Sequence, residues 1–248
     1  MSTPAALHSF GTDDASLPVP ARNETPKFDR LARVYRWMEW LSFGPFLSRC
    51  RRAFLPQFRE ARSALVLGDG DGRFTSALLR QNAQVRVDAV DASPAMLHAL
   101  QRRTATDASR LRTEVQDLRE WSAKSAASYD LIVTHFFLDC LTTDEVLALT
   151  ERVTPAATPD AHWVVSEFAV SDSAFGRWVA RPLVSLLYRA FGVLTGLRVR
   201  QLPDYSSVLK IAGFTLEKER TWLVGLLVAQ LWRRKEPQET RRTNDHPG

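Results

Sequence analysis

Apolar positions recur along this chain with two different periods, and the change between them falls near residue 63. Over 28–41, and again over 46–58, the apolar residues follow one another at the spacing of one helix face. This spacing predicts two amphipathic helices with arginines on their solvent-facing sides. Farther along, short apolar runs alternate with helical stretches, which predicts crossover units and a parallel sheet with helices on both faces.

The predicted fold class is α/β: a Rossmann-like, doubly wound, mostly parallel seven-stranded sheet with an N-terminal helical cap. Strands are expected at 64–67, 85–90, 111–115, 129–137, 163–170, 214–222 and 225–232. Helices are expected at 74–80, 93–100, 144–153, 174–193 and 204–212. The last two strands follow one another directly and are expected to form a closing pair.

The same pattern divides the chain into four parts. Residues 1–26 and 233–248 are polar without an apolar period, which predicts a disordered leader and a disordered tail. Between them we expect the cap at 27–62 and the α/β domain at 63–232. The leader shows no secretory signal, and the longest apolar run is shorter than the roughly 20 residues that span a bilayer.

Composition is that of a soluble globular protein, since 45% of the 248 residues are hydrophobic and 25% are charged. The formal charge of +5 is concentrated in the cap, where nine basic residues face three acidic ones. The body of the chain is close to neutral and shows no aromatic and basic platform, so we expect no nucleic-acid partner and at most peripheral membrane contact. Cys50 and Cys140 match no metal-ligand spacing, which predicts no metal site and fits a reducing cytoplasm.

Three glycines fall within five residues, between the first predicted strand of the sheet and the helix that follows it. Gly68, Gly70 and Gly72 alternate with Asp69 and Asp71. Glycine allows positive φ and close approach of a ligand, and the following helix presents unpaired N–H groups at its start. An isolated turn of this kind is more often a tight turn without a ligand. The residues around it in the fold must therefore show whether it binds one.

Acidic residues at the ends of the next two strands supply that context. Asp91 ends the second strand, nineteen residues after Gly72, where a carboxylate can accept hydrogen bonds from both hydroxyls of a ribose. Asp117 follows the third strand and could accept from an adenine amino group. Because the carboxyl ends of parallel strands share one edge, the sequence predicts a site for an adenosine-containing ligand. A dinucleotide is not favoured, since Arg73 stands where that motif needs its third glycine.

Several motifs resemble the class I S-adenosylmethionine-dependent methyltransferases. They are the glycine spacing before Arg73, the segment VDASPAML at 90–97 and the segment YDLIVT at 129–134, and they occur in the family's order. The resemblance implies the class I methyltransferase fold, S-adenosylmethionine as the cofactor and a small-molecule methyl acceptor. The candidate cofactor-binding residues are Tyr35, Gly68, Asp69, Gly70, Asp71, Gly72, Asp91, Ala92, Ser93, Met96, Asp117, Leu118, Thr134 and Phe136.

A looser resemblance links the flanks to the ubiquinone and menaquinone C-methyltransferases. The segments FDRLA at 28–32 and LSFG at 41–44 are similar to the N-terminal helices of that group, and 166–168 resembles its fifth strand. This likeness implies that Tyr35 lies over the cofactor and that the acceptor is quinone- or lipid-like. The residue after Tyr35 is Arg36, where that group often has an aspartate.

One departure leaves two alternatives open. Val66 stands where most of these methyltransferases carry an acid, two positions before the first glycine. Glycine–aspartate–glycine loops also occur in aminopropyltransferases, which use decarboxylated S-adenosylmethionine. The other alternative is a protein of this fold that binds a nucleoside without turnover.

Methyl transfer from a sulfonium needs alignment and a dry site more than it needs acid–base chemistry. A base is required only when the acceptor must lose a proton, and His135 is the catalytic candidate because imidazole titrates near neutral pH. A histidine that only shapes the site is the alternative. Asp139 is expected either to orient His135 or to cap the helix near Thr142.

Overall fold

The computed structural model describes residues 45–123, 128–169 and 202–235. Several predictions lie outside these residues: the leader, the first cap helix with Tyr35, the helix expected at 174–193 and most of the tail. Within the described part, no helix is both long enough and apolar enough to cross a membrane.

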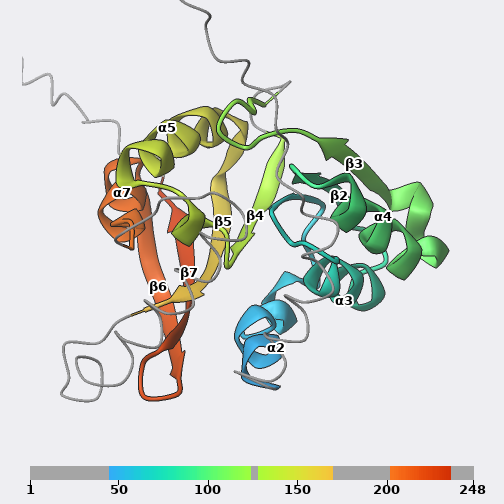
Figure 1. Cartoon of the computed structure of the whole chain (residues 1–248), viewed down its shortest axis with the longest axis horizontal. Coiled ribbons are helices and arrows are strands. Elements are labelled where there is room, and N and C mark those ends of the chain that lie inside the picture. The colour runs from blue at the N-terminus through green and yellow to red at the C-terminus, as the bar shows by residue number, and fades with distance from the viewer. Residues whose placement is uncertain (1–44, 124–127, 170–201, 236–248) are drawn as a thin grey trace, which may run out of the picture.

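A seven-stranded sheet forms the centre of the molecule, in the order β3-β2-β1-β4-β5-β7-β6 (Figure 1). Neighbouring strands from β3 to β5 are parallel, whereas β7 pairs antiparallel with β5 and with β6. The strands are β1 (Ser63–Leu67), β2 (Arg86–Asp91), β3 (Leu111–Val115), β4 (Tyr129–His135), β5 (Ala157–Phe168), β6 (Phe214–Trp222) and β7 (Leu227–Arg234). The predicted α/β class with a mostly parallel seven-stranded sheet is confirmed, including the closing pair of strands, while residues 27–44 of the predicted N-terminal cap lie outside the described residues.

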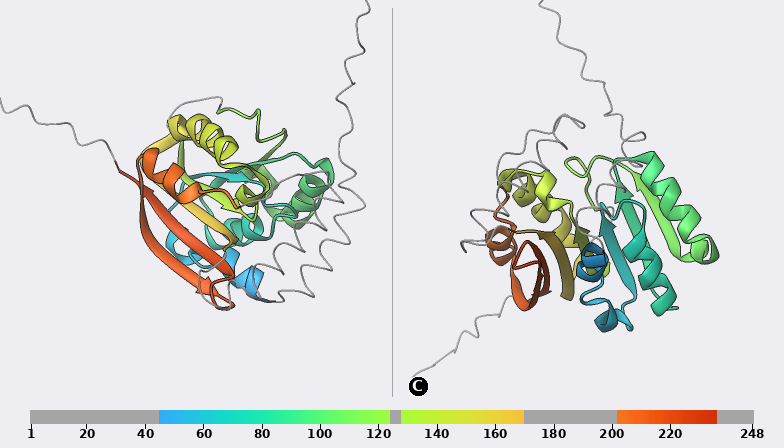
Figure 2. Two further views of the ribbon diagram at one scale, coloured as in Figure 1. Left: turned by 60° about the vertical axis from the view of Figure 1, so that its left-hand side comes forward. Right: turned by 60° about the horizontal axis from the view of Figure 1, so that its bottom comes forward.

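Helices cover both faces of this sheet. The α-helices are α2 (Pro45–Arg51), α3 (Arg73–Gln81), α4 (Pro94–Arg103), α5 (Thr143–Val153) and α7 (Tyr205–Ile211). The 3-10 helices are η1 (Leu55–Phe58), η2 (Ala105–Arg110), η3 (Leu138–Cys140) and η4 (Thr154–Ala156). Figures 1 and 2 show α5 and α7 together on one side of the sheet, with α2 and α3 on the other.

Side chains of the central strands alternate between these two layers. Val66 and Val133 lie in the cluster built with α2, η1 and α3, while Leu65 and Ile132 lie in the cluster built with α5 and α7. All four are at most 1% exposed. A strand buried on both faces needs apolar residues at every position, which explains the unbroken apolar runs of β1 and β4.

The helix predicted over 46–58 is wrong in its second half. The α-helix stops at Arg51, and tighter bonds follow, from Ala53 N to Cys50 O and from Leu55 N to Arg52 O. Pro56 then supplies no N–H, so a 3-10 turn replaces the last part of the helix.

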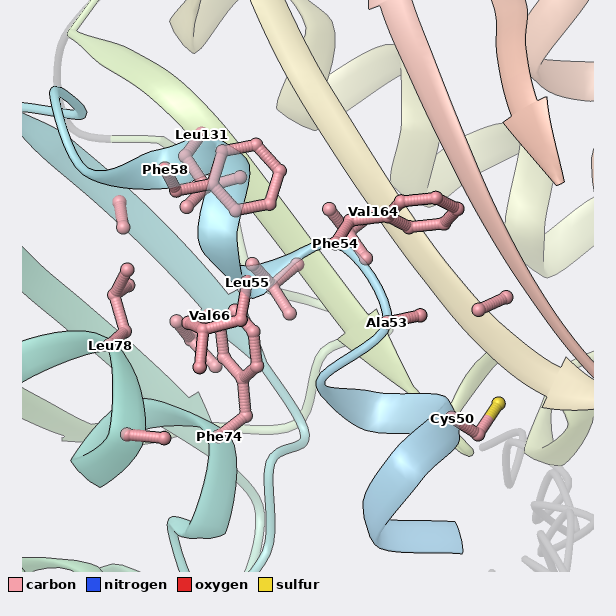
Figure 3. Packing of buried hydrophobic residues seen from close by; sticks show 14 of the residues in the cluster. Cys50, Ala53, Phe54, Leu55, Phe58, Val66, Phe74, Leu78, Leu131 and Val164 are labelled. Atoms are coloured by element: carbon pink, nitrogen blue, oxygen red, sulfur yellow. The ribbon is translucent and has the colours of Figure 1, made fainter. Parts of the chain in front are cut away.

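The arginines of this segment do not all face solvent, contrary to expectation. The Nη1 atom of Arg51 is buried, whereas Arg52 is exposed. Figure 3 shows why the segment is embedded: Phe54, Leu55 and Phe58 pack on the sheet beside Leu131. Residues 45–58 are therefore part of the helical layer on this face of the sheet.

Several strand boundaries differ from the predictions by one to six residues. β4 ends at His135 and not at residue 137, because Phe136 has a φ of +53° and leaves the extended conformation. β5 begins at Ala157, six residues earlier than expected. β7 continues to Arg234, past the expected start of the tail at 233.

Candidate functional site

All three glycines of the loop after β1 have positive φ, at +72° for Gly68, +58° for Gly70 and +76° for Gly72. A Cβ on Gly68 would lie 2.8 Å from Cγ of Phe137, and a Cβ on Gly72 would lie 2.5 Å from Cγ of Leu100. On Gly70 it would meet only Sδ of Met96, at an ordinary 3.8 Å. The outer two glycines are thus needed for packing inside the protein, and the middle one leaves backbone open to a ligand.

Asp69 caps the helix that follows the loop. Its Oδ2 accepts hydrogen bonds from the backbone N–H of Thr75 at 2.9 Å and from Oγ1 of Thr75 at 2.7 Å. Oδ1 is buried and has no hydrogen-bond partner among the described residues. Burial raises the pKa of Asp69 to about 6, against the hydrogen bonds from Thr75 and the charge of Arg51, which lower it. Asp69 therefore presents one unused acceptor oxygen next to the loop.

Asp71, the other acid of the loop, is held by arginines. Its Oδ2 lies 2.7 Å from Nη2 of Arg103 and 3.3 Å from Nε of Arg73. Arg103 also donates from Nε to the backbone oxygen of Asp71 at 2.8 Å. The side chain and the backbone oxygen of this candidate residue both tie the loop to α4.

At the end of β2, Asp91 meets the middle of the glycine loop. Its Oδ1 accepts from the backbone N–H of Ser93 at 2.8 Å, and a second backbone hydrogen bond comes from Gly70. Burial raises the pKa of Asp91, and these two N–H groups act in the opposite direction. The structure thus brings Asp91 and Gly70 together. Ala92 stands between Asp91 and Ser93, and Oγ of Ser93 caps α4 by accepting from the N–H of Met96 at 3.3 Å.

The candidates after β3 lie beside this point. Gln116 N donates to Asp91 O at 3.1 Å, which places the next residue, Asp117, near the end of β2. The Asp117 carboxylate is half exposed and accepts from the N–H of Arg119 at 2.9 Å. Leu118 is 3% exposed and packs in the cluster with α5.

The two candidates at the end of β4 face opposite sides of the sheet. Oγ1 of Thr134 accepts from Nε1 of Trp163 at 3.1 Å within the α5 layer, so its side chain is committed to packing. His135 points to the other face, where its ring meets the ring of Phe74 edge-on at 4.7 Å. Both ring nitrogens are buried without a hydrogen-bond partner among the described residues. Burial, and secondarily the charge of Arg51, lowers the pKa of His135 well below 6.5, so the imidazole is neutral at neutral pH.

Phe136 is one of the candidate cofactor-binding residues. Its ring carries the guanidinium of Arg51, with Cζ 5.0 Å from the ring centroid, and it also meets the ring of Phe168 at 5.1 Å. A protein cation therefore already lies on this aromatic face.

Two residues at this edge were missed by reasoning from sequence. Arg51 was assigned to a solvent-facing side, yet its charge acts on both Asp69 and His135. Glu167, 1% exposed at the end of β5, was noted only as part of a strand motif. The signal for Glu167 was present, because a charged residue within the apolar run of a central strand has to be satisfied internally.

Asp139 does not cap the helix α5. That helix begins with a capping box in which Thr142 and Glu145 satisfy each other's backbone N–H groups, so the capping alternative is wrong. Asp139 lies instead beside Cys140 and Glu167. Among the described residues, no three His, Cys, Asp or Glu side chains gather into a group that could hold a metal ion.

A family model described as "Methyltransferase domain" matches residues 65–163. None of the curated proteins matches the chain. Solved structures that share the fold include an O-methyltransferase family protein from Burkholderia thailandensis, with 16% identity and a TM-score of 0.63 over 84% of this chain and 60% of that one. A putative O-methyltransferase from Nostoc punctiforme has 15% identity and a TM-score of 0.65 over 86% and 63% of the two chains.

The N-methyltransferase NodS from Bradyrhizobium japonicum has 17% identity and a TM-score of 0.53, over 77% of this chain and 97% of that one. The chain spans about 60% of the length of the Burkholderia protein. The chain shares the fold of these methyltransferases, and the family match implies S-adenosylmethionine as the cofactor. The looser likeness to quinone C-methyltransferases finds no support in these comparisons.

The two kinds of glycine should respond differently to alanine. Gly72→Ala combines a left-handed backbone with a clash against Leu100, and we expect it to lower the free energy of unfolding by about 3 kcal/mol. Gly70→Ala meets no clash and should cost only about 1 kcal/mol. Urea denaturation followed by circular dichroism measures both variants, and equal losses would contradict this division of roles.

Asp69 should make stability depend on pH. Its pKa is about 6 in the folded protein and about 3.8 in the unfolded chain, so the folded state binds the proton more tightly. Its contribution to stability is therefore fully present below pH 4 and is lost as the pH rises through 6, by about 3 kcal/mol. We expect Asp69→Asn to remove this fall, as measured by urea denaturation between pH 4 and 7. If the free energy of unfolding changed with pH in the same way in the wild type and the variant, the burial of this charge would be contradicted. Asp160→Asn, at an exposed aspartate, is the control.

Proposed function

We propose that this chain is a methyltransferase that transfers the methyl group of S-adenosylmethionine to a small molecule. The observation that carries the proposal is the meeting of Asp91 with Gly70. It occurs at the carboxyl ends of β1 and β2, next to the reversal of strand order between β1 and β4. Open α/β sheets bind their ligands at such a point.

The described residues fit the adenosine part of the cofactor. Asp91 would accept hydrogen bonds from the ribose hydroxyls, with the backbone of Gly70 close by. Asp117, next to the end of β2, would accept from the adenine amino group, and Leu118 and Met96 would border the base. Gly68, Asp71 and Gly72 would form the rest of the loop that lies against the cofactor.

Two buried charges fit the amino-acid part of the cofactor. An α-amino acid end carries an ammonium and a carboxylate, and the loop offers the unused Oδ1 of Asp69 together with the nearby guanidinium of Arg51. Asp69 would thus perform the task of the acid that is absent at Val66. A positive residue here favours a cofactor that keeps its carboxylate, which supports methyl transfer over aminopropyl transfer from a decarboxylated cofactor.

The cofactor supplies a sulfonium methyl group, and the chain supplies alignment and exclusion of water. Phe136 would act by holding Arg51 in place. Burial against Phe74 keeps His135 neutral and disfavours its protonated form, so this residue would shape the site rather than serve as a base.

The acceptor we propose is a small molecule with a hydroxyl or an amino group. Support comes from the structural neighbours, which are described as O-methyltransferases and as an N-methyltransferase. On this fold, the site around the acceptor decides which atom is methylated.

Removal of the Asp91 carboxylate tests the proposal directly. We expect Asp91→Ala to weaken binding of S-adenosylhomocysteine at least tenfold, because two charge-assisted hydrogen bonds to the ribose would be lost. Isothermal titration calorimetry measures the dissociation constant, with Asp160→Ala as a control at a carboxylate that is 83% exposed. No binding by the wild type, or equal binding by Asp91→Ala, would refute the placement of the cofactor.

Substitution of Arg51 tests which cofactor the site binds. We expect the wild type to bind S-adenosylhomocysteine at least tenfold more tightly than 5′-methylthioadenosine, which lacks the amino-acid end. Arg51→Ala should reduce this ratio several-fold, because the carboxylate loses its cationic partner while the ammonium keeps Asp69. Arg52→Ala, at the exposed neighbouring arginine, should leave the ratio unchanged. A wild type that prefers the decarboxylated cofactor would instead indicate aminopropyl transfer.

A further inference from the structure

One buried charge lies at the carboxyl end of β5, outside the residues given a role above. Oε1 of Glu167 accepts hydrogen bonds from the backbone N–H groups of Phe137, at 3.1 Å, and Leu138, at 2.8 Å. A further backbone hydrogen bond to this carboxylate comes from Asp139. Three successive N–H groups thus converge on one side chain, an anion-binding nest that the protein fills with its own carboxylate.

The turn that Glu167 holds is strained where it begins. Phe136 has a φ of +53°, which is rare for a bulky residue. Its N–H donates to the backbone oxygen of Ser166 at 2.6 Å. Two consecutive residues of β5 therefore hold the turn, Ser166 by its backbone and Glu167 by its side chain. A strained backbone conformation persists only where several surrounding contacts hold it in place. The contacts from Ser166 and Glu167 of β5 do so here.

The same turn presses on the glycine loop. The ring of Phe137 lies where a Cβ of Gly68 would be, since that Cβ would be 2.8 Å from Cγ and 2.9 Å from Cδ2. On its other side Gly68 is fixed to β2, because its N–H donates to Val90 O at 3.0 Å. The first glycine of the loop is therefore held between β2 and Phe137, and the position of Phe137 depends on Glu167.

The surroundings of Glu167 indicate which substitution preserves this role. Burial and the adjacent Asp139 raise the pKa of Glu167 well above its ordinary value, so the carboxyl group readily holds a proton. The charge of Glu167 also acts on Tyr205 of α7, Cys140 of η3 and Cys50 of α2. A neutral amide of the same shape keeps an acceptor oxygen for Phe137 and Leu138, whereas alanine keeps none.

We propose that Glu167 is a positioning residue for the cofactor loop. It holds the backbone of Phe137 and Leu138, Phe137 presses on Gly68, and Gly68 sets where the loop backbone stands relative to Asp91. Glu167 thereby controls cofactor affinity without touching the cofactor. This inference rests on the proposed function, because the loop is taken to bind S-adenosylmethionine.

The test measures the dissociation constant of S-adenosylhomocysteine by calorimetry on the full chain. We expect Glu167→Ala to weaken binding about tenfold, and Glu167→Gln to bind within threefold of the wild type. Phe137→Ala should also weaken binding about tenfold. The double variant Glu167→Ala/Phe137→Ala should be no more than threefold weaker than either single variant, because both act through one contact.

Several results would overturn the proposal. Additive losses in the double variant would show that Glu167 does not act through Phe137. A tenfold loss in Glu167→Gln, or unchanged affinity in Phe137→Ala, would contradict it even if Glu167→Ala does not fold. Glu219→Gln, at an exposed glutamate of β6, is the matched control and should leave the affinity unchanged.

A second readout separates this proposal from the proposed function. Hydrogen exchange of the segment 64–74 needs no ligand, and we expect it to be faster in Phe137→Ala and Glu167→Ala than in the wild type and Glu167→Gln. If the wild type binds no S-adenosylhomocysteine, the proposed function fails, while this exchange still reports whether Glu167 positions the loop. Equal exchange in all four proteins would refute the positioning role.

Discussion

The pairing of β1 on both of its edges is the constraint on which the rest of the structure depends. Leu67, its last residue, lies opposite Val90 of β2 and opposite Thr134 of β4, both in parallel register. The strand is also buried on both faces. It therefore cannot shift without breaking its hydrogen bonds to β2 and β4 and its packing in the hydrophobic clusters on both faces of the sheet. The chain must therefore leave the sheet at Gly68, at the reversal of strand order, and Asp91 must end beside it.

The glycine loop is held at its two ends and open in the middle. Phe137 presses on Gly68 from the turn after β4, and Leu100 of α4 presses on Gly72. Both contacts come from elements that are themselves anchored, by Glu167 in one case and by the cap at Ser93 in the other. Rigid ends and an accessible centre are what a binding site for a small ligand needs, because affinity falls when the site must order itself on binding.

Buried charge is concentrated along the same edge. Asp69, Asp91 and Glu167 all have raised pKa values, with burial as the largest cause, and His135 is held neutral for the same reason. Each of the three carboxylates costs stability when it is charged, since a buried charge is destabilising unless it is fully hydrogen-bonded. A cluster of such groups at the ends of parallel strands is typical of sites that evolved to bind rather than to stabilise.

The sequence by itself determined the α/β class, the order of most elements, and the presence of the glycine loop and Asp91, because alternating periods and strand-end motifs are local signals. Only the tertiary structure decided that Thr134 meets Trp163 and His135 meets Phe74, that Arg51 turns inward, and that Glu167 holds a turn thirty residues earlier in the chain. A local pattern shows that a residue is polar or apolar. It does not show which distant backbone group that residue contacts, because such contacts depend on how strands far apart in the sequence come to lie side by side.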